Sequence, residues 1–437
     1  MEEKLKGHHI FGISYIKSQT HRSLMHSFKM VKNLNVLSAS KYRGLYEVLD
    51  GINQQIKNII NEKKDQEQPF NVIPYKDILK QDADWVGGKS ANLGEIQNRL
   101  KIAVPEGFAI TTKAFNTFLD KNNLRKEILE RKKLIDPDDI NNVELLNRLS
   151  TELTDLIKSK PVPDDIMADI RSALETVWGK KDVKEANKSK EEDNSNQKDN
   201  SNQKDNSDQK DNSGQKGEQN LESSSTIRVA MRSSAIGEDG DLSFAGQYLT
   251  LLNVTPEQIE DAYKSIIASL FSARSISYRI SKGIYDDYLA MAVACIRMVD
   301  SVASGVMYTR HPYNIVDDNI LINAVWGLGP YAVDGVIIPD SYVVQKKTEK
   351  DNLTEKADLT EKNDLPLILS RQISQKRIQL VCNTSDKQDD NRIEQEHGGV
   401  RQIPVPEEKQ SAPCLDDDQI QKLASYGRQL EDHYKSP

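Results

Sequence analysis

Apolar residues recur at every third or fourth position in the first part of the chain. From Ser23 to Ile60 this spacing predicts amphipathic helices, and the small residues at 38–40 predict a break between them. We therefore expect an antiparallel helix pair that makes residues 1–68 a helical extension. Helical spacing returns from Leu119 to Trp178, with a break at residues 161–163.

Short apolar runs in the second half of the chain predict β-strands. They occupy residues 291–299, 303–309, 319–326 and 340–345, with two shorter strands between 370 and 383. Helices are predicted at 419–434 and at 256–278, because Thr255-Pro-Glu-Gln258 is typical of a helix N-terminus. Helices and antiparallel strands in this succession predict an α+β fold.

Polar repeats interrupt these elements. The hexapeptide Asn-Gln-Lys-Asp-Asn-Ser starts at Asn196 and again at Asn202, and Thr-Glu-Lys recurs from Thr348 onward. Such segments cannot bury enough apolar surface to fold, so we interpret them as disordered surface inserts. We divide the chain into a helical extension (1–68), a first lobe (69–180), an insert (181–225), a second lobe (226–347), a second insert (348–365) and the remainder of the second lobe (366–437).

The overall charge limits the possible partners. A formal net charge of −8 on 437 residues offers no general attraction to nucleic acid or to an anionic membrane, so a phosphate site would have to be local. No apolar run approaches the ~18 residues of a membrane span, and the charged N-terminus does not resemble a signal peptide. We expect a cytoplasmic protein. The three cysteines lie far apart without metal-ligand spacing.

The stretch from Val229 to Val254 carries the clearest candidate chemistry. A short apolar strand presents Arg232, Ser233 and Ser234, and a loop of small and acidic residues follows. Hydroxyl groups and closely approaching glycine amides can donate to anionic oxygens, and an arginine can hold a phosphate with two parallel hydrogen bonds. On spacing alone, an ordinary hairpin with a surface arginine is an equal alternative.

A second candidate is the Gly87-Gly88-Lys89 turn, which leads into a predicted helix. At the start of a helix, the backbone amides and the helix dipole favour an anion, and Lys89 would add a positive charge. The spacing does not match a Walker loop. The alternative is a Gly-Gly loop with a solvated lysine.

The order of these motifs resembles the ATP-binding part of the phosphoenolpyruvate synthase and pyruvate phosphate dikinase family. The resemblance rests on Val-Ala-Met-Arg-Ser-Ser-Ala, Ser-Phe-Ala-Gly-Gln and Gly-Gly-Lys-x-x-x-Leu-Gly-Glu, and it covers roughly residues 69–437. Val104-Pro-Glu-Gly-Phe108, Ser304-Gly-Val-Met-Tyr-Thr309 and Asn323-Ala-Val-Trp-Gly-Leu-Gly329 resemble further family segments. This resemblance implies a two-lobed ATP-grasp-like fold with ATP between the lobes.

Site residues follow from the resemblance by position. Lys89 and Arg232 match the family's phosphate-contacting lysine and arginine, and we expect them to be catalytic. Met298 lies in the segment where the family reads adenine. The residues expected to bind ATP are Lys89, Arg232, Ser233, Ser234, Gly246, Gln247, Thr250 and Met298.

Three departures from the family pattern concern the metal and the adenine. Pro330 stands where the family has a glutamate for Mg²⁺, and Ile296 or Arg297 lies near the place of the family's hinge glutamine. The sequence also ends before the family's Asp-Ile-Glu-Trp strand. The metal ligands are therefore unknown, although we expect that Asp334, Asp340, Glu238 or Asp239 could replace one lost carboxylate.

Several functions fit this sequence. The first is an ATP-binding kinase or phosphotransferase module with Mg²⁺, which phosphorylates a histidine on a separate or missing domain. Its partners would then include this phosphohistidine domain and a pyruvate- or phosphoenolpyruvate-binding domain on another chain. The alternatives are a degenerate nucleotide-binding or regulatory protein without phosphotransfer, and a truncated gene product.

Overall fold

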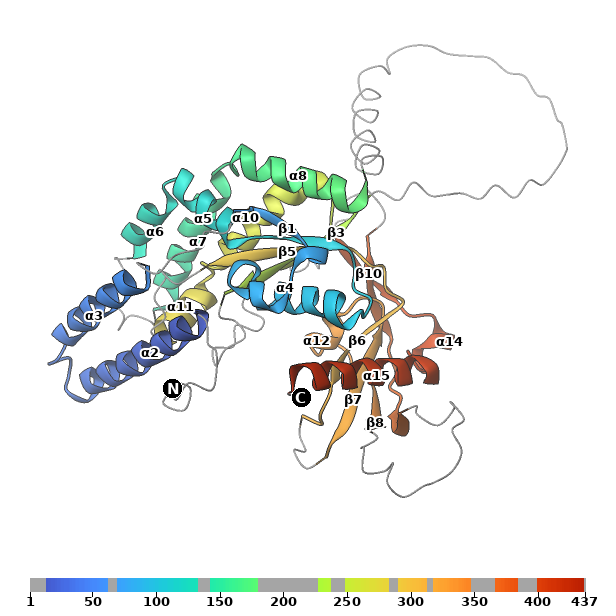
Figure 1. The fold of residues 1–437 in the computed structure, drawn as a ribbon. Helices are drawn as coiled ribbons and strands as arrows, with labels where there is room; N and C mark the ends of the chain where they lie inside the picture. The colour runs from blue at the N-terminus through green and yellow to red at the C-terminus, as the bar shows by residue number, and fades with distance from the viewer. Residues whose placement is uncertain are drawn as a thin grey trace, which may run out of the picture.

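The computed structural model describes residues 13–61, 69–132, 142–179, 227–236, 248–282, 290–312, 317–346, 366–383 and 399–435. These residues form a helical hairpin, a five-stranded sheet covered by helices, and a four-stranded sheet with its own helix (Figure 1). The hairpin consists of α2 (Ile13–Leu37) and α3 (Gly44–Asn61). Ala39 and Ser40 adopt positive φ between these two helices and reverse the chain. No helix among the described residues is long and apolar enough to cross a membrane.

The five-stranded sheet is antiparallel throughout and has the order β1-β2-β5-β3-β4. Its strands are β1 (Val72–Pro74), β2 (Gly107–Ile110), β3 (Val229–Ala235), β4 (Thr250–Val254) and β5 (Met291–Arg297). β3 and β5 come from segments that are far apart in the sequence, yet they pair along their full length. The buried apolar side chains of β5 place it at the centre of the sheet.

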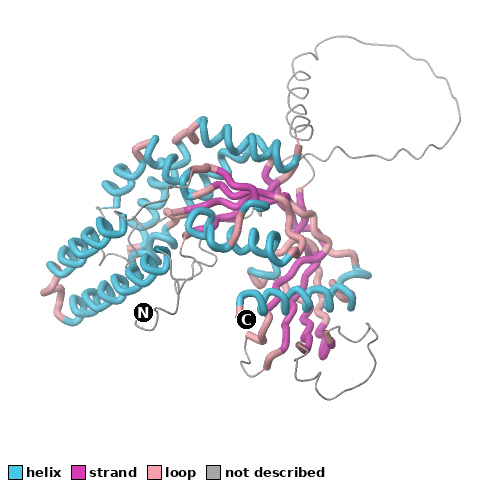
Figure 2. The backbone as a smooth tube through the Cα atoms, in the orientation of Figure 1, coloured by secondary structure: helices cyan, strands magenta, loops and turns pink. Residues whose placement is uncertain are grey.

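Helices cover both faces of this sheet (Figure 2). One face carries α4 (Ala83–Glu95), with the short helices η1 (Tyr75–Asp77) and η2 (Lys80–Asp82) before it and the π-turn η3 (Ile96–Leu100) after it. The other face packs against the main apolar core. The helices of that core are α5 (Thr112–Lys121), α6 (Leu124–Lys132), α7 (Val143–Ser159), α8 (Asp164–Trp178), α10 (Ile259–Ser269) and α11 (Ala273–Lys282). The short η5 (Pro256–Gln258) comes directly before α10.

β3, β4 and β5 lie within the range 226–347 but belong to the first sheet, so from here on the second lobe means the unit that begins at β6. It is built on a four-stranded antiparallel sheet whose strands follow the chain order. Its strands are β6 (Ala303–Tyr308), β7 (Asn319–Trp326), β8 (Asp340–Gln345) and β9 (Leu367–Gln372). α15 (Asp417–Tyr434) packs Ile420 and Ala424 against this sheet. The remaining elements are α12 (Pro330–Val333), α14 (Glu407–Gln410) and the strand pair β10 (Ile378–Cys382) and β11 (Val400–Pro404).

The predicted α+β class is confirmed, but one predicted helix is wrong. Instead of one helix over 256–278, the chain forms α10 and α11 with a break between them. At the break, the Ser272 hydroxyl accepts a hydrogen bond from the amide of Ser275 at 3.2 Å, which starts the second helix. The buried Arg279 guanidinium donates to the carbonyl of Leu270, which ends the first helix.

Candidate functional site

The glycine turn before Lys89 fits tightly against β3. Within α4, Gly87 has φ 74° and ψ 159°, so the helix is interrupted there and restarts at Gly88. A Cβ atom at Gly87 would lie 2.2 Å from the carbonyl oxygen of Ser234, so only glycine fits at this position without a clash. Lys89 therefore stands in the first turn of the restarted helix, as the sequence predicted, and this turn lies directly over β3.

Ser234 fixes the position of this turn. Its hydroxyl oxygen accepts a hydrogen bond from the amide of Ser90 at 3.3 Å, and Ser90 Oγ in turn accepts one from the Tyr75 hydroxyl at 3.4 Å. Ser233 and Ser234 are both buried. Ser234 thus caps a first-turn amide in this structure, while the predicted contact of either hydroxyl with ATP stays a prediction.

Arg232 and Thr250 lie on the same sheet face as α4. Alternate residues of a strand point to opposite faces, and Met231 packs into the helical core on the other side. Arg232 pairs with Thr250 on β4 and with Ala294 on β5, and Ala294 packs into the cluster under α4. The fold therefore brings together Arg232, Thr250 and the turn that carries Lys89.

The charge of Arg232 interacts electrostatically with the buried Tyr75. Burial raises the pKa of the Tyr75 hydroxyl far above its usual value, and the hydrogen bond to Ser90 and the positive charge of Arg232 act in the opposite direction. The guanidinium group itself belongs to an exposed residue. Arg232 is therefore accessible to an anion from solvent.

Met298 lies where the two lobes are connected. Its amide donates to the carbonyl of Arg228 at 2.9 Å, which extends the pairing beyond the end of β5. Its side chain packs beside Leu328 and Leu380, in a cluster that joins the second lobe to β10. Arg297 is exposed, and Ile296 packs under α4. Of the expected ATP-binding residues, Gly246 and Gln247 lie outside the described residues.

The Trp-Gly-Leu-Gly segment forms a rigid corner after β7. Gly327 has φ 74°, and a Cβ there would lie 2.3 Å from the carbonyl oxygen of Leu380. The amide of Leu328 donates to this same carbonyl at 2.8 Å, and the Trp326 indole donates to the carbonyl of Lys409 at 3.0 Å. This corner leads directly into Pro330, the first residue of α12.

Comparison with known proteins bears on the motifs at this site. The family model of the pyruvate phosphate dikinase AMP/ATP-binding domain matches residues 83–190 and 211–437. The chain belongs to this family. The family assignment made from the motifs is thereby confirmed.

Relatives in the pyruvate phosphate dikinase family include phosphoenolpyruvate synthases from two bacteria. Those of Neisseria meningitidis and Escherichia coli are each 31% identical to this chain over 84% of its length. A probable phosphoenolpyruvate synthase from Methanothermobacter thermautotrophicus is 30% identical over 83% of the chain. The chain spans 39% of the length of the first two relatives and 42% of the third.

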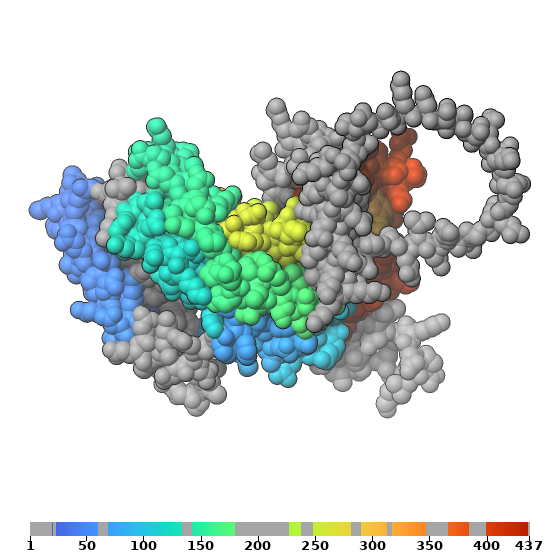
Figure 3. Space-filling view, turned by 90° about the horizontal axis from the view of Figure 1, so that it is seen from above, coloured from blue at the N-terminus to red at the C-terminus, as the bar shows by residue number. Residues whose placement is uncertain are grey.

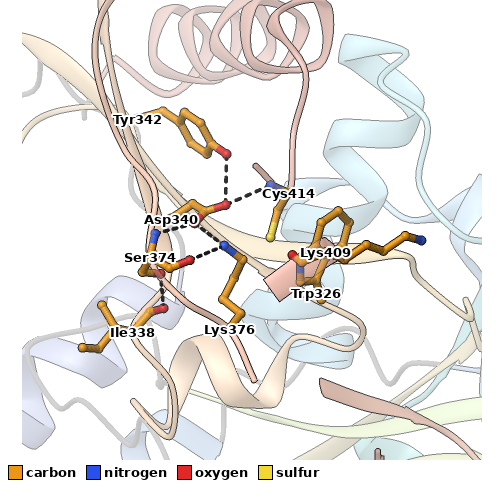
Figure 4. Close-up of polar contacts among 8 residues, drawn as sticks. All are labelled: Trp326, Ile338, Asp340, Tyr342, Ser374, Lys376, Lys409 and Cys414. Atoms are coloured by element: carbon orange, nitrogen blue, oxygen red, sulfur yellow. Dashed lines mark hydrogen bonds and ion pairs between the residues drawn. The ribbon is translucent and has the colours of Figure 1, made fainter. Parts of the chain in front are cut away.

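Asp340 was one expected substitute for the family's metal-binding glutamate, and the structure gives it a different role (Figure 4). The buried carboxylate pairs with Lys376, whose side chain is also fully buried. The amides of Ser374 and Cys414 donate to the two oxygens at 3.0 and 2.8 Å, and the Tyr342 hydroxyl donates at 3.3 Å. All these donors occupy the lone pairs that a cation would need, so the expectation for Asp340 is wrong.

The pKa of Asp340 reflects these contacts. Burial acts to raise this pKa, but the Lys376 ammonium and the two amides outweigh burial and hold the pKa below its usual value. The carboxylate therefore stays ionised as a structural group that joins β8, the segment before β10 and the segment before α15. Sequence patterns did not reveal this pair, because its members are separated by 36 positions.

No three His, Cys, Asp or Glu side chains group together as a metal site would need in the part of the chain that the structure describes. Pro330 offers no side-chain oxygen, and Glu238 and Asp239 lie outside the described residues. The described residues therefore do not identify which side chains would hold Mg²⁺.

A contact between the lobes was also missed from the sequence. His433 of α15 lies 2.9 Å from Glu95 at the end of α4, and the Lys80 ammonium lies 4.5 Å from the ring centroid of Tyr434. The amide of Lys80 donates to the same Glu95 carboxylate at 3.1 Å. Glu95 belongs to the Leu-Gly-Glu motif, which was the one available sequence signal. This contact fixes the end of α15 against the helix that carries Lys89.

Proposed function

We propose that the chain is an ATP-binding phosphotransferase module of the phosphoenolpyruvate synthase type, with an ATP-grasp-like arrangement. The observation that carries this proposal is the position of Arg232, Thr250 and the Lys89 turn on one face of the first sheet. The triphosphate would lie over this face, between the first sheet and the second lobe. The family of the chain and the names of its relatives support this proposal.

The chemistry of phosphoryl transfer suits these residues. Catalysis of this reaction depends on positioning and on neutralising negative charge rather than on covalent steps. Lys89 would act as a point charge beside helix N-terminal amides, and Arg232 would hold two phosphate oxygens at once. Met298 would contribute an apolar surface for adenine. Bound Mg²⁺ would neutralise phosphate charge, and the described residues do not identify its protein ligands.

The acceptor in this proposal is a histidine on another domain. A phosphohistidine domain and a pyruvate- or phosphoenolpyruvate-binding domain would be supplied by another chain or by a longer form of this protein. This part of the proposal rests on the names of the relatives, of which the chain spans about two fifths.

Calorimetric titration with ATP, with and without Mg²⁺, tests the nucleotide site. We expect binding in the roughly micromolar range, weakened at least about tenfold in Lys89→Ala and in Arg232→Ala, because each removes a charge-assisted phosphate contact. Lys126→Ala is the matched control, since this lysine is 82% exposed on α6, a helix of the main core on the other face of the sheet. Absence of ATP binding by a folded parent chain would refute the proposal.

A second candidate is a nucleotide-binding protein without phosphotransfer. Pro330 favours it, because proline offers no carboxylate where the resemblance implies a metal-binding glutamate. Phosphate-labelled ATP can be incubated with the chain and a separately produced phosphohistidine domain of the proposed kind. Acid-labile label on that domain, lost with Lys89→Ala, supports phosphotransfer. ATP binding without label transfer supports the second candidate.

A further inference from the structure

The α2–α3 hairpin stands at one end of the molecule, before the region that the family model matches (Figures 1 and 3). The two helices contact each other through one seam. Leu24 and Phe28 of α2 pack with Leu49 of α3, and the rings of Phe28 and Tyr46 have centroids 5.7 Å apart. These residues form the hydrophobic core of the hairpin.

Each helix carries a second stripe beside this seam. The residues of both stripes are spaced alternately by three and four positions, which is the spacing of helices that associate in bundles. On α2 the stripe consists of Thr20, Ser23, Ser27, Met30, Leu34 and Leu37, and on α3 of Leu45, Val48, Ile52, Gln55 and Ile59. The hairpin alone therefore leaves one helix-packing surface on each helix uncovered.

The two stripes lie on the same side of the hairpin. A shallow groove of about 310 Å³ is lined by Thr20, Ser23 and Ser27 from α2 together with Ile52 from α3, next to core residues of the hairpin. Several apolar members are well exposed: Met30 by 72%, Leu37 by 87% and Ile59 by 61%. Neither stripe contains a charged residue. An uncharged, exposed apolar surface of this kind is typical of the core of an interface.

We propose that this surface binds the same surface of a second copy of the chain. Two hairpins would then form an antiparallel four-helix bundle around a two-fold axis. With the axis parallel to the helices, α2 of one copy lies over α3 of the other. Such an axis keeps each residue at its height along the helices, so Ser23 and Ser27, which line the groove with Ile52, would face the partner's Ile52 and place small side chains against a large one.

The size of the surface favours a second hairpin over a single helix. The 18 residues of α3 extend over about 27 Å, and two adjacent helices are about 20 Å wide. Each copy would therefore contribute roughly 500 Å², and the two together about 1,000 Å², which is near the lower limit for a specific interface. A single partner helix would cover only one of the two stripes fully.

Sedimentation velocity of the full chain over a range of concentrations tests this proposal. We expect a species of twice the 49.4 kDa chain mass, with a dissociation constant in the roughly micromolar range. The variant Val48→Lys/Ile59→Lys places charges in the centre of the contact. Its dissociation constant should rise at least about 100-fold, because buried unpaired charges strongly disfavour association.

The matched control is Gln54→Lys/Asn58→Lys, which adds the same charge to exposed polar positions of α3 outside the stripe. This control should dimerise like the parent chain. Circular dichroism and thermal unfolding verify that both variants remain folded, as expected for substitutions at exposed positions. A parent chain that stays monomeric at about 100 μM overturns the proposal, even if it then binds a helical peptide. A dimer that persists in Val48→Lys/Ile59→Lys, or is lost in the control, also overturns it.

Discussion

Gly87→Ala gives the sharpest test of how the Lys89 turn is held. The added Cβ would lie 2.2 Å from the carbonyl oxygen and 2.3 Å from the hydroxyl oxygen of Ser234. Carbon and oxygen atoms need about 3.2 Å, so the turn would have to retreat by about 1 Å. The hydrogen bond from the amide of Ser90 to Ser234, now 3.3 Å long, would then exceed bonding distance.

Two contributions set the expected loss of stability in Gly87→Ala. An alanine at this backbone conformation costs about 1–3 kcal/mol, and the lost hydrogen bond costs about 1 kcal/mol. We therefore expect Gly87→Ala to lower the free energy of unfolding by about 2–4 kcal/mol. If Lys89 contacts the ATP phosphates as proposed, a shift of 1 Å should also weaken ATP binding by roughly tenfold to hundredfold.

Gly51→Ala is the matched control. Gly51 lies exposed in α3, and an added Cβ would meet nothing within 4 Å. This substitution should stabilise the protein by up to about 1 kcal/mol, because alanine loses less conformational entropy in a helix. Thermal unfolding and calorimetric ATP titration of both variants provide the two readouts. If Gly87→Ala matches the parent chain in both, the reasoning about this turn is refuted.

Three further predictions concern buried groups. Lys376→Met should cost about 3–5 kcal/mol in urea unfolding because it leaves the buried Asp340 carboxylate unpaired, and Asp340→Asn in the same chain should recover most of this loss. Burial opposes the lowered pKa of Glu95, but the Lys80 amide and His433 outweigh it. The Glu95 contact therefore stabilises the fold at pH values above the usual pKa of a glutamate, and this stabilisation is lost as the pH falls through the lower pKa of Glu95 in the folded chain. The thermal stability of Glu95→Gln should therefore depend less on pH between about 5 and 3 than that of the parent chain. Burial raises the pKa values of the three buried thiols, that of Cys382 to about 11. These thiols should therefore react with a thiol reagent at neutral pH only after unfolding, as mass spectrometry can check.

Local pattern was sufficient for most strands, but it missed β1 and β11 and did not show the contacts between strands. The predicted strand at 319–326 has the bounds of β7, since a buried antiparallel strand needs a continuous apolar run. The break between α10 and α11 was missed because it depends on the side chains of Ser272 and Arg279. Apolar periodicity contains no information about such side-chain capping.

The candidate site was predictable in its residue types but not in its geometry. The motifs indicated Lys89 and Arg232, but their common face follows from the pairing of β3 with β5, which come from distant segments. The same limit applies to Glu95 and His433, which are 338 positions apart. The role of Asp340 was predicted wrongly because its partner Lys376 lies on a segment that no spacing rule connects to it.

The β10–β11 pair restricts how the two lobes can move. The Asn253 side chain, at the edge of the first sheet, donates to the carbonyls of Asn383 and Gly399 at the end of this pair. On the other side, Leu328 of the second lobe is bonded to the carbonyl of Leu380. Separating the lobes here would break either the two hydrogen bonds from the Asn253 side chain or the backbone hydrogen bond from Leu328. Separating the lobes on the α15 side instead requires release of the Glu95 contact with His433 and of the adjacent ring contact, so among the described residues side-chain contacts alone hold that end of the interface.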